Sequence, residues 1–153
     1  MRTSQQDEML KKLPELLRKY SLNNAVGYSD GQKFFNKYII PNYLTNENRH
    51  QLEFYNKTKY GKGVYQELSG VGPVFKVKGE DTLLHVAFGL RLTYEEAFML
   101  FWYSGKTLLI DDPVMGTINS ILLELDIIRI DKHIENPVAE LERLIGENNL
   151  HLR

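Results

Sequence analysis

The sequence predicts a mainly α-helical fold, and three observations support this prediction. Apolar side chains recur three and four positions apart over much of the chain, which is the spacing of one helix face. Capping residues precede several of these segments, and glycine or proline separates them. Hydrophobic residues make up 42% of the 153 residues and charged residues 25%, which is typical of a globular domain with a packed core.

The first expected helix covers residues 7–20, where apolar side chains such as Met9 and Leu13 lie at helical spacing. Pro14 falls inside this segment. Because proline removes a backbone donor and crowds the preceding turn, the helix is expected to kink there or to begin near Leu13.

Residues 21–32 are expected to form a loop, because Asn, Ser, Gly and Asp dominate them. A short helix over 32–40 is expected to stop before Pro41, since proline disfavours helical angles in the residue ahead of it. Another helix is expected over 45–57, with Thr45 as an imperfect cap.

Residues 80–90, EDTLLHVAFGL, place apolar side chains on one helical face. The next helix begins with Thr93 as its N-cap and Glu96 three residues later, which is the capping-box pattern. Gly105 is the expected stop of this helix.

Two later helices are expected to begin with a capping residue followed by proline, at Asp112–Pro113 and at Asn136–Pro137. Gly146 is the expected end of the second of these helices. Residues 127–130, IIRI, are interpreted as a brief strand because isoleucine favours extended structure.

The segment from Tyr60 to Gly79, YGKGVYQELSGVGPVFKVKG, is compatible with two structures. VYQEL and VFKVK both alternate, and the residues between them could close a β-hairpin. In the alternative, Val64 and Leu68 lie four apart on one helix face and Gly70 ends the helix. The residues alone leave both structures open.

Charge is divided unevenly along the chain. Residues 1–48 have a net charge of +2, residues 49–78 of +4 and residues 79–153 of −7. This pattern predicts a basic surface for one partner and an acidic remainder that limits non-specific binding, with ordinary surface charge as the alternative.

No apolar run approaches the ~18 residues that a membrane span needs, and no signal peptide is evident. Without cysteines there is no disulfide framework, which fits a reducing compartment. We therefore expect a cytoplasmic protein with no membrane partner.

No segment has a pattern typical of catalysis or metal binding. SGKT at 104–107 lacks the glycine that a phosphate-binding loop needs five positions before Gly105, where the chain has Leu100. The four histidines are scattered rather than paired at helical spacing. We expect neither an enzyme nor a bound metal or cofactor.

A resemblance rests on three consecutive segments. YQELSG at 65–70 is followed by a loop with proline and two lysines, then by TLLHVAFGL at 82–90 and LTYEEAFML at 92–100. This order resembles the second half of the helix-turn-helix domain of phage-repressor and Cro type, the XRE family. Residues 104–125 look like the further helices that some bacterial and mobile-element relatives carry after this domain.

The resemblance implies that QLEFYNKT is the first helix of the motif and KGVYQELS the recognition helix. It also implies that Tyr65 and Gln66 contact base edges while lysines contact phosphates. The expected nucleic-acid-binding residues are Lys57, Lys59, Tyr60, Lys62, Tyr65, Gln66, Lys76 and Lys78.

The expected fold is therefore a helix-turn-helix bundle with extra N-terminal and C-terminal helices, and a short β-hairpin near 63–78 is the alternative. The expected organisation is an N-terminal helical segment (1–43), a helix-turn-helix-like core (44–105) and a C-terminal helical extension (106–153). Helix-turn-helix proteins of this type usually pair two half-sites, so a homodimer is expected.

Two classes of function are expected from these features. The first is a sequence-specific transcriptional regulator of a bacterium, phage or mobile element, with double-stranded DNA as its partner. The alternative is a protein-binding inhibitor or adaptor on a helix-turn-helix scaffold, such as a phage-encoded, anti-CRISPR-like inhibitor of a host defence nuclease. In that case the acidic C-terminal half would contact the protein partner.

Overall fold

The computed structural model describes residues 4–20, 30–45, 49–70, 79–131 and 133–152. Every regular element within these ranges is a helix, which confirms the mainly α-helical prediction. The elements are α1 Ser4–Tyr20, α2 Asp30–Phe34, the π-helical turn η1 Phe35–Ile39, α3 Ile40–Tyr43, α4 His50–Thr58, α5 Lys62–Ser69, α6 Glu80–Gly89, α7 Tyr94–Tyr103, α8 Pro113–Leu122, α9 Leu125–Ile130 and α10 Pro137–Glu147.

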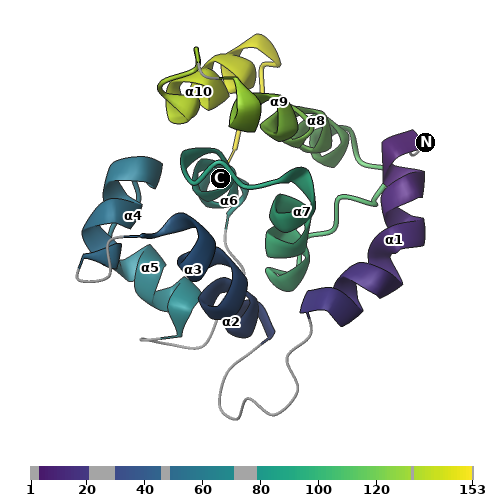
Figure 1. Cartoon of the computed structure of the whole chain (residues 1–153). Helices are drawn as coiled ribbons and strands as arrows, with labels where there is room; N and C mark the ends of the chain where they lie inside the picture. The colour runs from purple at the N-terminus through teal and green to yellow at the C-terminus, as the bar shows by residue number, and fades with distance from the viewer. Residues whose placement is uncertain (1–3, 21–29, 46–48, 71–78, 132, 153) are drawn as a thin grey trace.

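The helices surround a central pair. Figure 1 shows α6 and α7 in the middle, α1 on one side, α2 to α5 on the other, and α8 to α10 across the top. The most extensive packing of α6 is against α4 and α10, so the last helix of the chain covers the same core as the fourth.

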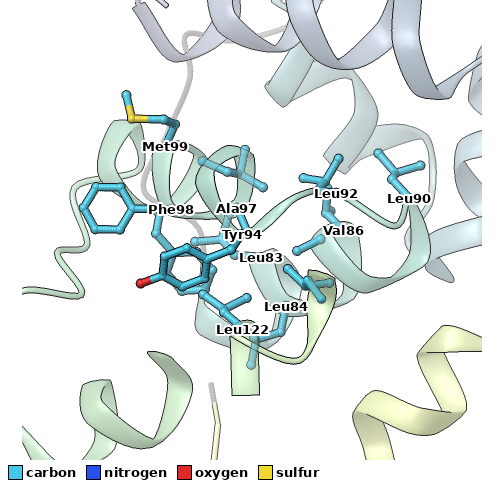
Figure 2. Close-up of a cluster of buried hydrophobic side chains, with 14 of the residues drawn as sticks. Leu83, Leu84, Val86, Leu90, Leu92, Tyr94, Ala97, Phe98, Met99 and Leu122 are labelled. Carbon is cyan, nitrogen blue, oxygen red and sulfur yellow. The ribbon is translucent and has the colours of Figure 1, made fainter. Parts of the chain in front are cut away.

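The core is built largely from α6 and α7. Figure 2 shows part of it, where apolar side chains of these two helices meet Leu122 of α8. Leu83, Phe88, Phe98 and Leu122 are all almost completely buried. Each such side chain contributes about 1.5–3 kcal/mol relative to exposure, so tertiary burial stabilises both helices beyond their intrinsic propensity.

Three helix starts confirm the capping predictions. The Thr93 hydroxyl accepts from the Glu96 N–H while the Glu96 carboxylate accepts from the Thr93 N–H, which completes the capping box of α7. Asp112 caps α8 and Asn136 caps α10, each with proline at the first helical position. Gly105 follows α7 with φ 79°, as expected of a glycine that ends a helix.

α1 runs through Pro14, so the prediction of a start near Leu13 is wrong. Pro14 lies on the exposed side of the helix, as does Leu10, whose carbonyl the proline leaves without its usual donor. Water can satisfy that carbonyl, and the proline is therefore tolerated. Figure 1 shows the helix bending along its length.

The helical path also continues through Pro41, so the predicted stop before that residue is wrong. η1 contains the wider π turn, in which the Ile40 N–H donates to the Phe35 carbonyl five residues earlier. Pro41 follows this π turn, so its missing donor falls where the backbone already departs from the regular i→i−4 hydrogen-bond pattern.

Three other boundaries differ from the predictions. α4 begins at His50 after Arg49, so Thr45 is not its cap. Residues 127–130 are helical within α9 rather than a strand. α10 passes Gly146, and Asn149 takes the left-handed conformation after the helix, with φ 51°. Asparagine is one of the few residues other than glycine that adopt this conformation readily.

The described part of the segment 63–78 is helical, because α5 spans Lys62–Ser69. VYQEL is therefore part of a helix and not a strand of a hairpin. Gly70 ends this helix with φ 80°, which is the stop expected from the sequence. VFKVK lies outside the described residues. Among the described helices, none has the length and apolar character that crossing a lipid bilayer demands.

Candidate nucleic-acid interface

α4 and α5 are joined by a turn of three residues, 59–61, within the roughly three to four residues of a helix-turn-helix motif. Lys59 has φ 67°, and its N–H donates to the Tyr55 carbonyl at 2.8 Å. A left-handed residue at this position ends the first helix and redirects the chain. Gly61 is extended and precedes α5, so the second helix begins immediately.

Thr58 stabilises the turn from within. Its buried hydroxyl donates to the Phe54 carbonyl at 2.8 Å and accepts from the Tyr60 N–H at 3.2 Å. Both hydrogen bonds satisfy groups that the end of α4 and the turn would otherwise leave buried without partners. The conformation at residues 59–61 is therefore fixed by local hydrogen bonds.

An aromatic cluster holds the two helices together. The rings of Phe54 and Tyr65 lie 5.6 Å apart, and each lies 6.2 Å from the ring of Phe35. All three rings meet edge to face, an arrangement worth about 0.5–1.5 kcal/mol per pair beyond area burial. α4, α5 and η1 therefore share one small core.

Two amides hold the C-terminal end of α5. The Gln32 side chain donates to the Glu67 carbonyl at 3.3 Å, and the Asn36 side chain donates to the Ser69 carbonyl. Carbonyls in the last turn of a helix lack intrahelical donors, so these contacts satisfy groups left over by the helix end. The sequence gives no signal for them, because they join residues more than 30 positions apart.

Gly89 allows α4 to approach α6 closely. A Cβ atom built on Gly89 would lie 2.2 Å from the Lys57 carbonyl oxygen, far inside van der Waals contact. Only glycine permits this distance between the two backbones. The position of α4 relative to α6 therefore depends on residue 89.

Lys59 and Gln66 are the predicted site residues that remain available at the surface. Lys59 is exposed, and no carboxylate in the described part of the chain pairs with it. Gln66 is half-buried on α5, and Glu67 beside it is exposed to a similar degree. Lys57 is exposed as well, but its ammonium lies 2.9 Å from a Glu53 oxygen and donates to the Tyr43 carbonyl at 2.9 Å.

Tyr65 points inward, which corrects its expected role at a base edge, whereas Tyr60 is half-buried and its role stays a prediction. Tyr65 is buried in the aromatic cluster, and burial raises the pKa of its phenol. Its ring therefore cannot contact a base edge. Tyr60 is half-buried and packs against α6. Its hydroxyl donates to Asp81 at 2.5 Å, and its ring lies 5.4 Å from that of His85. Burial and then the bond to Asp81 raise the pKa of Tyr60.

The structure describes little of the other three predicted lysines. Lys62 is the first residue of α5, but the position of its side chain is outside what the structure describes. Lys76 and Lys78 lie outside the described residues. Their roles therefore stay predictions.

Two residues of the same surface were missed. Arg49 and Asn56 are exposed, and their helical positions place them on one face of α4 with Leu52. Arg49 was missed because it is the N-cap of α4 and lies outside QLEFYNKT, the segment that the resemblance assigned to the first helix. Its position after a polar segment and before the apolar pattern could have indicated a helix start.

The start of α5 is open to a ligand. No side chain caps this helix, and nothing lies within 4 Å of a Cβ built at Gly61 or Gly63. The first N–H groups of a helix attract anions, particularly where glycine lets a ligand approach the backbone. Gly61 and Gly63 are poor helix formers, but without side chains they leave room for a phosphate to reach the backbone N–H groups.

The described surface also has hollows, one of which is lined in part by Asn56, Lys57 and Lys59 of the candidate interface. A cleft of about 440 Å³ separates α1 from the start of α7 and is lined by residues that include Lys12, Glu95 and Glu96. Three of its carboxylates have partners: Glu95 lies 3.8 Å from Lys12, Glu96 accepts from Thr93 and from the Tyr43 hydroxyl, and Asp126 accepts from the Tyr94 N–H. A polar groove of about 560 Å³ lies where the ends of α4 and α6 meet the start of α10.

The described residues contain no group of three or more His, Asp or Glu side chains arranged to hold a metal ion. Comparisons of the chain with models of protein families, with curated proteins and with solved structures gave no match.

Proposed function

We propose that this protein binds double-stranded DNA through α4 and α5 and acts as a sequence-specific transcriptional regulator of a bacterium, phage or mobile element. One observation carries the proposal: α4 and α5 are joined by a three-residue turn whose first residue, Lys59, is left-handed and exposed. Two helices connected in this way can place the second helix in the major groove of DNA.

The side chains around the turn are suited to a duplex. Lys59 and Arg49 supply cations for phosphates, and the uncapped start of α5 supplies backbone donors. Gln66 is the candidate for base contact, because a glutamine amide forms two hydrogen bonds with adenine in the major groove. A homodimer would place two such helices on adjacent half-sites.

The experiment is a gel shift with duplex DNA from upstream of the protein's own gene, repeated over a series of salt concentrations. Affinity is expected to fall linearly on a logarithmic plot against salt, and Lys59→Ala is expected to reduce the slope by about one. Gln66→Ala is expected to reduce discrimination between sequences by about 1–3 kcal/mol. The matched control is Lys11→Ala, an exposed lysine on α1 on the other side of the molecule.

A second candidate function is binding of another protein as an inhibitor or adaptor. The observation that favours it is the distribution of exposed apolar side chains, since several lie on the acidic C-terminal half: Ile110, Val114, Ile127 and Ile130. Capture of host proteins by the purified protein, repeated after nuclease treatment, separates the two functions. Partners that remain bound after nuclease support the second, and loss of all partners supports the first.

A further inference from the structure

α9 presents an apolar pair to solvent. Ile127 is 55% exposed and Ile130 is 78% exposed, whereas Leu125 and Ile128 on the other side of the same helix are buried. A helix that needed only to cover the core would carry polar residues on its outer side. Two isoleucines three positions apart lie on the same face and form one contiguous apolar surface.

Carboxylates surround this pair. Glu124 is exposed and Asp131 is partly exposed, and their positions place them beside the isoleucines on the outer side of the helix. Arg129 is directed away from that side, since its Nε donates to the Arg91 carbonyl at 3.1 Å. We define the α9 face as Glu124, Ile127, Ile130 and Asp131; it is apolar at its centre and acidic at its edge.

α4 presents a surface of the same geometry and opposite charge. Leu52 is 49% exposed and Tyr55 is 50% exposed, again three positions apart on the outer side of a helix. Arg49, Asn56 and Lys59 are exposed beside them. We define the α4 face by these five residues, none of which is a carboxylate.

The carboxylate nearest to the α4 face in sequence is already paired. Glu53 lies 2.9 Å from the Lys57 ammonium, at the side of the helix rather than at the centre of the outward face. The α4 face therefore has the cations Arg49 and Lys59 at its edge, and Glu135 lines the groove beside Lys59. The charge of the α4 face is the opposite of that of the α9 face.

From this complementarity we propose that the α9 face of one copy of the protein packs against the α4 face of a second copy. The apolar pairs would meet at the centre, and the cations of α4 would face the carboxylates of α9. Pairing α9 with α9 would bring carboxylates together, and pairing α4 with α4 would bring cations together. The contact is therefore head-to-tail, and it closes into a ring or extends as a chain of copies.

The α4 face shares Arg49 and Lys59 with the proposed DNA interface, so this association would compete with DNA binding, but it can be tested without DNA. The two faces are short, so the contact belongs to the class of small, transient interfaces. Sedimentation velocity of the full chain, over the widest concentration range the method allows, is expected to show reversible self-association. Lys59 is left unchanged in every variant, because it also belongs to the proposed DNA interface.

Two variants each remove one face. Ile130→Asp places a charge in the α9 face, and Leu52→Asp places one in the α4 face. Each is expected to weaken self-association at least about 30-fold, the effect of losing a central contact residue. Ile110→Asp is the matched control, because this isoleucine is also 50% exposed but belongs to neither face. The control is expected to associate like the unaltered chain.

Mixing the two variants gives the decisive result. The Ile130→Asp chain keeps its α4 face and the Leu52→Asp chain keeps its α9 face, so an equimolar mixture is expected to form one-to-one dimers that grow no further. The proposal is overturned if the unaltered chain is monomeric throughout, or if the mixture stays monomeric. It is also overturned if Leu52→Asp self-associates normally, because that would indicate a contact between two α9 faces.

Discussion

Replacing Lys59 by glycine is expected to stabilise the protein while weakening its binding to DNA. Lys59 has φ 67°, and an L-residue in this left-handed conformation costs about 1–2 kcal/mol. Glycine adopts it freely but loses about 0.5–1 kcal/mol more conformational entropy on folding. The difference favours glycine by about 0.5–1 kcal/mol. For a chain of this size that raises Tm by about 1–4 °C.

The same substitution removes one exposed cation from the proposed interface. If Lys59 neutralises one phosphate, the logarithmic slope of affinity against salt decreases by about 0.9. Lys59→Ala removes the same charge without relieving the left-handed strain. It is therefore expected to change the slope equally, with no gain in stability.

Thermal unfolding followed by circular dichroism measures the first effect, and fluorescence anisotropy with a labelled duplex over a salt series measures the second. A lower Tm for Lys59→Gly than for Lys59→Ala would refute the left-handed turn. An unchanged salt slope in both variants would refute the phosphate contact even if the stability result held.

Three further predictions concern the fold that positions the interface. Gly89→Ala places a Cβ 2.2 Å from the Lys57 carbonyl, so it should destabilise the protein by about 1–3 kcal/mol in urea unfolding; an unchanged midpoint would contradict the close approach of α4 and α6. Thr93→Ala should lower the free energy of unfolding by about 1 kcal/mol in the same assay, because it removes the capping box of α7. An unchanged free energy of unfolding would argue against the cap. Burial raises the pKa of Tyr94 from 10.0 to about 12. The phenol therefore ionises at lower pH in the unfolded chain than in the folded protein. The resulting stabilisation of about 3 kcal/mol is fully present below pH 10 and should be lost as the pH rises to 12. Tyr94→Phe should reduce this loss.

Local signals predicted several helix starts and stops correctly. The capping residues Thr93, Asp112 and Asn136 and the glycine stops at Gly70 and Gly105 act within one helical turn, so the sequence around them contains the needed information. The boundaries that failed depend on distant residues. Residues 127–130 favour a strand by composition, but burying Leu125 and Ile128 against the core requires a helix.

The candidate site shows the same division. The helix over 62–69 was one of two structures that the sequence allowed, but the direction of Tyr65 depends on Phe35 and Phe54, which are distant in sequence. A tyrosine on a short helix can face a groove or a core, and periodicity alone does not decide between them. The half-buried position of Gln66 follows from the same packing, because Tyr65 and Leu68 set the buried side of α5.

The measurement that most directly tests the central claim is the change in backbone amide chemical shifts when labelled protein is titrated with duplex DNA from upstream of its own gene. The largest changes are expected at residues 59–66, in the turn and the first half of α5, with smaller changes near Arg49. Changes confined to α8 and α9, or no change at low salt, would contradict the proposal that α4 and α5 form the DNA interface.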